Sequence, residues 1–145
     1  MANRLPPKPL STNIKNTPRS IGVVILGFLI IFILSVVTDT ILENAGVLPR
    51  GTLPLKGSVG LLLVVLAYRA LYSLIGCYVA ARLAPRNSMK HALAVGIIGV
   101  VVSILGSVAM SGKAPVWYDV VLIAMTLPIA WLGGKLQLIT EKKSG

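Results

Sequence analysis

Few residues in this 145-residue chain belong to the types that carry out chemistry. It has a single histidine, His91, a single cysteine, Cys77, and only four acidic residues. This supply does not favour a zinc site, a haem held by two histidines or a Cys-His nucleophile pair. The apolar run around Cys77 also disfavours a reactive thiolate. The sequence therefore predicts a protein that is not an enzyme and that holds no metal or other cofactor.

One charged residue stands in an unusual place. Arg69 is the only charge among the 25 residues between Lys56 and Arg82. An unpaired charge at the centre of a bilayer costs at least about 2.5 to 3.5 kcal/mol, so Arg69 needs a partner or water. Helical side chains point toward the N-terminus of their helix, and in that direction lie two carboxylates, Asp39 and Asp119, on other apolar segments.

We therefore expect an intramembrane polar cluster in the outer half of a helical bundle. The predicted members are Arg69, Asp119, Asp39, Tyr72 and Ser73, with Ser35, Thr38 and Tyr118 available for further hydrogen bonds. The sequence leaves open whether Arg69 pairs with Asp119, Asp39 or both. It also leaves open whether the cluster is a buried ion pair that fixes which helices meet or a functional ion or substrate site.

The elements that must position this cluster follow from composition. Apolar residues make up 55% of the chain, charged residues 12%, and the mean hydropathy is +0.86. Nearly uncharged runs long enough to cross a bilayer predict helices at about 20–45, 57–83, 89–111 and 115–134. We expect an all-α membrane protein: a four-helix transmembrane domain over 20–135, a flexible basic tail over 1–19 and a C-terminal tail over 136–145.

Orientation follows from the distribution of Lys and Arg. The N-terminal tail, the second connection and the C-terminus together hold ten of them, against three on the other side of the predicted helices. The positive-inside rule then places both termini in the cytoplasm. The net charge of +10 is explained as a topology signal, so no nucleic-acid partner is expected, and the lipid bilayer is the expected environment.

Small and aromatic residues supply the remaining structural signals. Small residues recur at helical spacing in the second and third segments and predict that these two helices pack against each other, or that the third also forms a contact between copies of the chain. The predicted packing residues are Gly76, Ala80, Gly96, Gly99, Ser103 and Gly106. Aromatic residues near both ends of the fourth segment, Trp117, Tyr118 and Trp131, are predicted to anchor it at the two membrane interfaces.

A set of short motifs resembles an uncharacterised group of small four-helix bacterial membrane proteins. The motifs are Thr38-Asp39, Tyr68-Arg69 with Tyr72, Ala81-Arg82-Leu83-Ala84-Pro85, His91-Ala92, Trp117-Tyr118 and Ala130-Trp131-Leu132-Gly133-Gly134. The resemblance implies a multi-pass protein of the bacterial inner (plasma) membrane and brings no activity with it.

Three function classes remain. The first is a non-catalytic subunit or assembly component of a membrane complex, which the short connections and the single polar cluster favour; its partner is another membrane protein. The second is a small oligomeric transporter or channel that uses the Arg69 cluster, with a second copy of the chain as partner. The third, a membrane-embedded enzyme, is the least favoured, because no His, Cys or carboxylate group is arranged for acid–base, metal or nucleophilic work.

Overall fold

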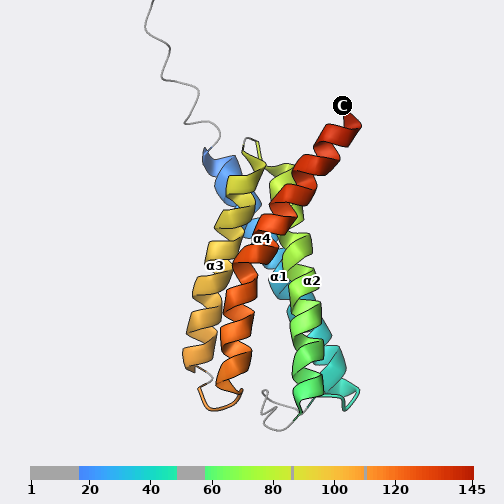
Figure 1. Ribbon diagram of the computed structural model, residues 1–145, viewed down its shortest axis with the longest axis vertical. Coiled ribbons are helices and arrows are strands. Elements are labelled where there is room, and N and C mark those ends of the chain that lie inside the picture. Colours follow the sequence, from blue (N-terminus) through green and yellow to red (C-terminus); the bar gives the residue numbers. More distant parts are fainter. Residues whose placement is uncertain (1–16, 49–57, 86, 110) are drawn as a thin grey trace, which may run out of the picture.

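The structure, a computed structural model, describes residues 17–48, 58–85, 87–109 and 111–145 (Figure 1). Its four helices are α1 (Thr17–Asn44), α2 (Val59–Leu83), α3 (Ser88–Ala109) and α4 (Val116–Ser144). Each is long and apolar enough to cross a membrane. Helices suit such segments because every backbone polar group is satisfied within the helix when no water is present. The predicted all-α fold, with four helices able to span a membrane, is confirmed.

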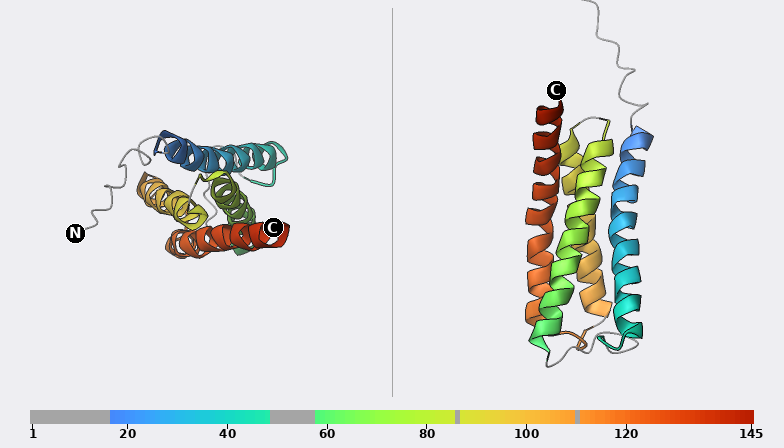
Figure 2. Two further views of the ribbon diagram at one scale, coloured as in Figure 1. Left: turned by 90° about the horizontal axis from the view of Figure 1, so that it is seen from above. Right: turned by 90° about the vertical axis from the view of Figure 1, so that its right-hand side faces the viewer.

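The helices lie closer together at one end of the bundle than at the other. Helices α2 and α3 contact each other and both contact α4, whereas α1 contacts α2 and α3 but, over the described residues, not α4. The two views of Figure 2 accordingly place α1 and α4 on opposite sides of α2 and α3. Toward the α3–α4 turn α1 moves away from α3 (Figure 1), whereas α2 and α4 stay packed through Leu62 and Tyr118. The bundle is therefore closed at the end where α4 finishes and open at the other.

Small residues bring the helices together in the closed half. A Cβ added at Gly27 of α1 would lie 2.8 Å from the Cβ of Ala80, and one at Gly76 would lie 2.6 Å from the carbonyl oxygen of Gly27. A Cβ at Gly96 of α3 would lie 2.5 Å from that of Ala130 on α4. Such distances leave no room for a side chain. We call these five residues the glycine crossing.

The packing partners differ from those expected. Helices α2 and α3 do contact each other. However, Gly76 and Ala80 of α2 face α1, while Gly96 and Gly99 of α3 face α4. The physical reason is that α2 and α3 each pack against several helices at once, and spacing along one helix does not identify which neighbour its small face meets.

Helix α4 continues to Ser144, beyond the predicted end at Gly134, so most of the expected C-terminal tail is helical. Its glycine pair is a contact surface and not a stop signal. A Cβ added at Gly133 would lie 2.8 Å from the Cβ of Cys77, and one at Gly134 would lie 2.8 Å from the sulfur of Met89. Of the predicted N-terminal tail, residues 1–16 lie outside the described residues, and α1 already begins at Thr17.

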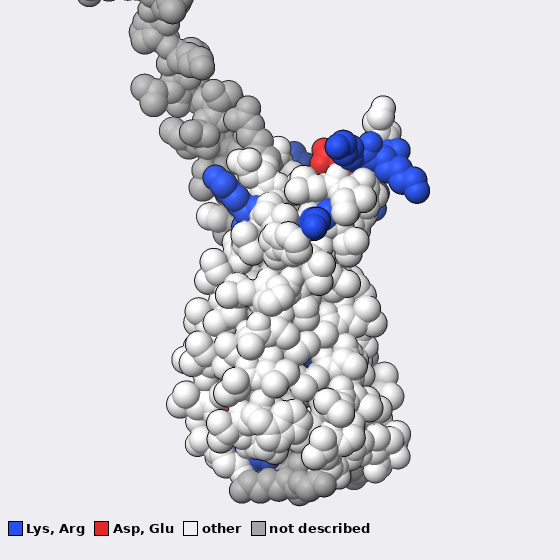
Figure 3. Space-filling view, in the orientation of Figure 1, with Lys and Arg blue, Asp and Glu red and all other residues white. Residues whose placement is uncertain are grey.

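Basic residues gather at the closed end. Arg19 lies near the start of α1, Arg82 in the last turn of α2, Lys90 in the first turn of α3 and Lys142 in the last turn of α4. Figure 3 shows blue side chains over this end and a long uncharged surface beneath it. At the opposite end, Lys113 lies in the connection between α3 and α4. The uncharged surface has the length and character of a lipid-facing belt.

Candidate functional site

Arg69 pairs with Asp39 in the open half of the bundle. Its Nη2 donates a hydrogen bond to Oδ2 of Asp39 at 3.1 Å, and the hydroxyl of Tyr68 donates to the other oxygen, Oδ1. One turn along α2, the hydroxyls of Tyr72 and Thr38 are 2.8 Å apart and hydrogen-bonded. A seam of polar contacts thus joins α1 to α2.

The helical repeat explains this seam. Tyr68, Arg69 and Tyr72 are one, three or four positions apart on α2, so they lie on the side of the helix that meets Thr38 and Asp39 on α1. The rings of Tyr68 and Tyr72 lie 5.8 Å apart, centroid to centroid. The hydroxyl of each tyrosine is hydrogen-bonded to a residue of α1. Neither ring therefore leaves an unpaired polar group in the apolar region.

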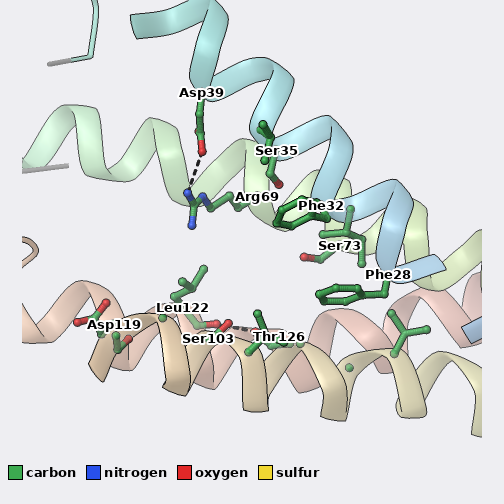
Figure 4. Close-up of a pocket in the computed structure, with 18 of the residues that line it drawn as sticks. Phe28, Phe32, Ser35, Asp39, Arg69, Ser73, Ser103, Asp119, Leu122 and Thr126 are labelled. Carbon is green, nitrogen blue, oxygen red and sulfur yellow. Dashed lines mark hydrogen bonds and ion pairs between the residues drawn. The ribbon is translucent and has the colours of Figure 1, made fainter. Parts of the chain in front are cut away.

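The ion pair leaves much of the guanidinium free. An Arg carries five N–H donors, and Arg69 makes one hydrogen bond to a described side chain, through Nη2. Its Nε is buried and has no partner among the described residues. The side chains of Arg69 and Asp39 are 27% and 28% exposed, so the pair is open on one side. Figure 4 shows the guanidinium directed into the space between the helices.

Asp119, the other expected partner, lies across that space. It lines the same cavity from α4 but forms no ion pair with Arg69 within the described structure. Figure 4 places Asp119 on the opposite wall from Asp39. Both α1 and α4 pack on α2 near this level, but Tyr118 is the residue of α4 that packs against α2, and Asp119 next to it lines the cavity from the side opposite Asp39. The open choice between the two aspartates thus falls to Asp39 in this structure.

The cavity has a volume of about 300 Å³ and draws residues from all four helices. Its outer part is polar and includes Asp39, Arg69, Lys113 and Asp119. Further in, the wall carries hydroxyls and then apolar and aromatic side chains (Figure 4). These residues include Ser35, Ser73, Ser103 and Thr126, followed by Phe28, Ile31, Phe32, Cys77 and Val95.

Tyr118 is placed differently from its neighbours. It was expected to anchor α4 at the membrane interface, but its side chain is only 3% exposed and packs in a cluster with Leu62, Val65 and Leu66 of α2. Its hydroxyl is buried without a partner among the described residues, and the residue lines the cavity. Trp117 and Trp131, at 39% and 45% exposure, face outward as anchors do.

Several expected packing residues turn out to line the cavity. Ser103 and Gly106 of α3 do so, and a Cβ added at Gly106 would meet no atom of the described residues within 4 Å. Gly99 lines the cavity and also packs against α4, because a Cβ added to it would lie 3.2 Å from Thr126. The signal that could have revealed this wall was the hydroxyl at Ser103 within an otherwise small and apolar stripe.

The other potentially reactive side chains, His91 and Cys77, lie away from Arg69. His91 is near the closed end, with Nδ1 3.2 Å from the carbonyl oxygen of Asn87. Cys77 is 2% exposed, at the inner limit of the cavity. Within the described ranges, no three His, Cys, Asp or Glu residues are close enough to hold a metal ion.

Comparisons with known proteins complete the description of the site. No protein-family model, curated protein or solved structure matches the chain. The resemblance to the small bacterial membrane proteins stays a prediction from sequence. The case for a function therefore rests on the chemistry of the Arg69 cavity.

Proposed function

We propose that the protein is a small, non-catalytic membrane transporter or channel that binds a ligand carrying an acidic group in the Arg69 cavity. The observation that supports this most is a cavity of about 300 Å³ between the helices with a half-satisfied arginine in its wall. Ligand pockets commonly measure about 300 to 1,000 Å³, are mostly apolar and carry a few oriented polar groups.

The free donors favour an acidic ligand. Among the described residues Arg69 makes one hydrogen bond, to Asp39, and its remaining N–H groups have no partner there. Planar, forked donors of this kind match the oxygens of a carboxylate or phosphate, and such charge-assisted bonds are about twice as strong as neutral ones. A charge in a membrane helix that faces a cavity is by default a candidate for a substrate or ion pathway.

If the protein were instead a subunit of a membrane complex, the class that the sequence favoured, the cavity would be filled by a partner. In a permanent complex a partner helix would cover the residues between α1 and α3, and water would not reach them. Purification in mild detergent also separates the two: a stoichiometric larger partner supports the subunit, whereas a homo-oligomer with a water-accessible cavity supports transport.

Cysteine accessibility tests the proposal. In a Cys77→Ser background, Ser103→Cys places a thiol on the cavity wall, and Leu105→Cys places one two residues away on the same helix, where Leu105 is 63% exposed on the outer surface. We expect a charged, water-soluble thiol reagent to modify Ser103→Cys in membranes and to leave Leu105→Cys unmodified, because the thiolate reacts only where water reaches it. Equal lack of reaction at both positions would refute the proposal.

We also infer that the protein resides in a bacterial inner membrane with both termini in the cytoplasm. The inference is supported by the ten Lys and Arg residues on one side against three on the other, and by the motifs shared with small bacterial membrane proteins. A cytoplasm-active reporter fused to Gly145 should be active, as should a periplasm-active reporter inserted near Thr52. A silent cytoplasmic reporter at Gly145, with a working periplasmic one there, would reverse the topology.

A further inference from the structure

The cavity opens sideways between α1 and α3. Where the bundle is closed, Val23 of α1 and Val95 of α3 belong to one buried cluster. Further out the same two helices carry exposed side chains on the cavity wall, Phe32 at 53% and Val102 at 43%. Beside them, Gly106 faces open space. The opening therefore faces the region that lipid chains occupy, and not only the water at the end of the bundle.

On the α2–α4 side the cavity is closed. Tyr118 and Leu122 of α4 pack with Leu62, Val65 and Leu66 of α2 in a single buried cluster. This cluster lies at the level of the polar end, because Tyr118 lies in the first turn of α4 and lines the cavity there. One lateral side is thus sealed by apolar packing and the opposite one is open.

Polarity changes in order along the cavity. Arg69 and Asp39 lie at the outer end, Ser73 and Thr126 in the middle, and the rings of Phe28 and Phe32 at the inner end (Figure 4). The distance along the helix axis from Asp39 to Phe28 is about 16 Å at 1.5 Å per residue, which spans about half of a bilayer's hydrocarbon core. A molecule that fills this space has a polar head and an apolar chain that lies along the lipid chains.

Two hydrogen-bond donors at the polar end of the cavity indicate the chemistry of the ligand's head group. Arg69 and Tyr118 approach the cavity from α2 and α4, and the Nε of Arg69 and the hydroxyl of Tyr118 are both buried without a partner in the described part of the chain. Tyr118 is 97% covered, so its hydroxyl is not satisfied by bulk water. Because Tyr118 packs against α2, the two donors lie on adjacent helices at the polar end of the cavity, where one oxyanion can accept from both. Asp39, already bonded to Arg69 and Tyr68, does not compete for that place.

We propose that the ligand is a membrane amphiphile with a single long apolar chain and an anionic phosphate or carboxylate head, which enters between α1 and α3 and binds its head at Arg69 and Tyr118. This rests on the proposed function and names its ligand class. Asp119 stands on the far wall as a like charge, which limits affinity for the anion and does not contribute to it.

Direct binding to the purified full-length chain in a neutral maltoside detergent tests the ligand class. Hexadecyl phosphate should bind with one molecule per chain at saturation, as counted by native mass spectrometry. Hexadecyltrimethylammonium, with the same chain and the opposite charge, should not bind, and inorganic phosphate should not compete. Binding of inorganic phosphate alone would overturn the amphiphile and leave the acidic-ligand proposal intact.

Matched variants locate the binding. Arg69→Gln should weaken hexadecyl phosphate binding about tenfold or more, since hydrogen bonds to charged groups contribute about 1.5 to 3 kcal/mol. Arg82→Gln, on the exposed last turn of the same helix, should leave it unchanged. Asp119→Asn should leave it equal or tighter. Weaker binding for Asp119→Asn would mean that the head carries a cation, which contradicts an anionic head.

A steric variant keeps the test valid if Arg69→Gln does not fold. Gly106→Phe adds a ring where the space is open, so the helices need not move, but the ring occupies the α1–α3 opening. Gly22→Phe adds the same ring at an open position outside the cavity. Hexadecyl phosphate binding should be lost in the first and kept in the second. Unchanged binding in both would refute lateral binding at this site.

Discussion

The two halves of this bundle are built on opposite principles. In the closed half, Gly76 and Gly96 allow backbones to touch, with added Cβ positions within 2.6 Å of neighbouring atoms. In the open half, α1 and α2 are joined through the side chains of Asp39, Arg69 and Tyr72, α2 still packs on α4, and a cavity of about 300 Å³ lies between α1 and α3. The same small residue, glycine, is a contact at position 96 and a vacancy at position 106.

The difference shows how a small membrane protein can hold a cavity open. Helices in lipid gain little from burying apolar surface, so close backbone packing supplies much of the association. When that packing is confined to one end, the other end can diverge. Hydrogen bonds between α1 and α2 then replace lost contacts without closing the space between α1 and α3. The closed half should therefore carry stability, and the open half should carry binding.

The largest expected effect comes from overfilling the closed half. Gly76→Leu forces a side chain against the carbonyl oxygen of Gly27, so the free energy of unfolding should fall by about 3 kcal/mol. Thermal unfolding in detergent measures this. Gly22→Leu, at a position with open space, is the control and should stay close to wild type. A Gly76→Leu protein as stable as the control would mean that the helices do not touch here.

A smaller effect is expected at the ion pair of the open half. Arg69→Leu removes the described hydrogen-bond donor to Oδ2 of Asp39. Because the pair is partly exposed, the free energy of unfolding should fall by about 1 to 2 kcal/mol. Asp39→Asn should cost less than this, and Asp119→Asn least. The comparison is made by melting temperatures in one detergent. An unchanged melting temperature for Arg69→Leu, or an effect of Asp119→Asn as large, would contradict the Arg69–Asp39 pairing.

A single hydroxyl tests the seam between α1 and α2. Tyr72→Phe removes the hydrogen bond to Thr38, and the expected loss is about 1 kcal/mol. Tyr78→Phe, two turns further along α2 and without a side-chain hydrogen bond in the described structure, should change the melting temperature less. If the two variants are equal, the seam does not contribute to joining the helices.

The smallest effect is expected where glycine faces the cavity. Gly106→Leu meets no atom within 4 Å of its Cβ, and leucine favours helix more than glycine does, so stability should stay within about 0.5 kcal/mol or rise slightly. Gly96→Leu, on the same helix at the glycine crossing, should lose far more. Similar losses for both would erase the distinction between the halves.

The sequence could predict height within the membrane but not position around the bundle. The side-chain direction of Arg69 correctly pointed toward Asp39, yet the same reasoning offered Asp119, because depth does not tell which wall a helix forms. The predicted end of the fourth helix at about residue 134 was too early for a related reason. Only the closeness of Cys77 and Met89 shows that Gly133 and Gly134 form a helix contact.

The cavity itself was beyond the reach of sequence patterns. Gly99, Ser103 and Gly106 have the spacing of a packing seam, and the first of them packs while the other two line open space. Tyr118 and Trp117 are adjacent aromatic residues of the type found at membrane interfaces. Being one position further along the helix, Tyr118 faces α2 and is buried against it. Such outcomes depend on how far the helices diverge, which no single segment encodes.

The boundary between the halves can be measured directly on α2. Cys77 is 2% exposed at the inner limit of the cavity, and Ser73 lies one turn further out on the same face. A charged, water-soluble thiol reagent should leave Cys77 unmodified in the folded wild-type protein and modify a Ser73→Cys, Cys77→Ser variant. If the Ser73→Cys thiol is as unreactive as Cys77, the open half is closed to water and the account is wrong.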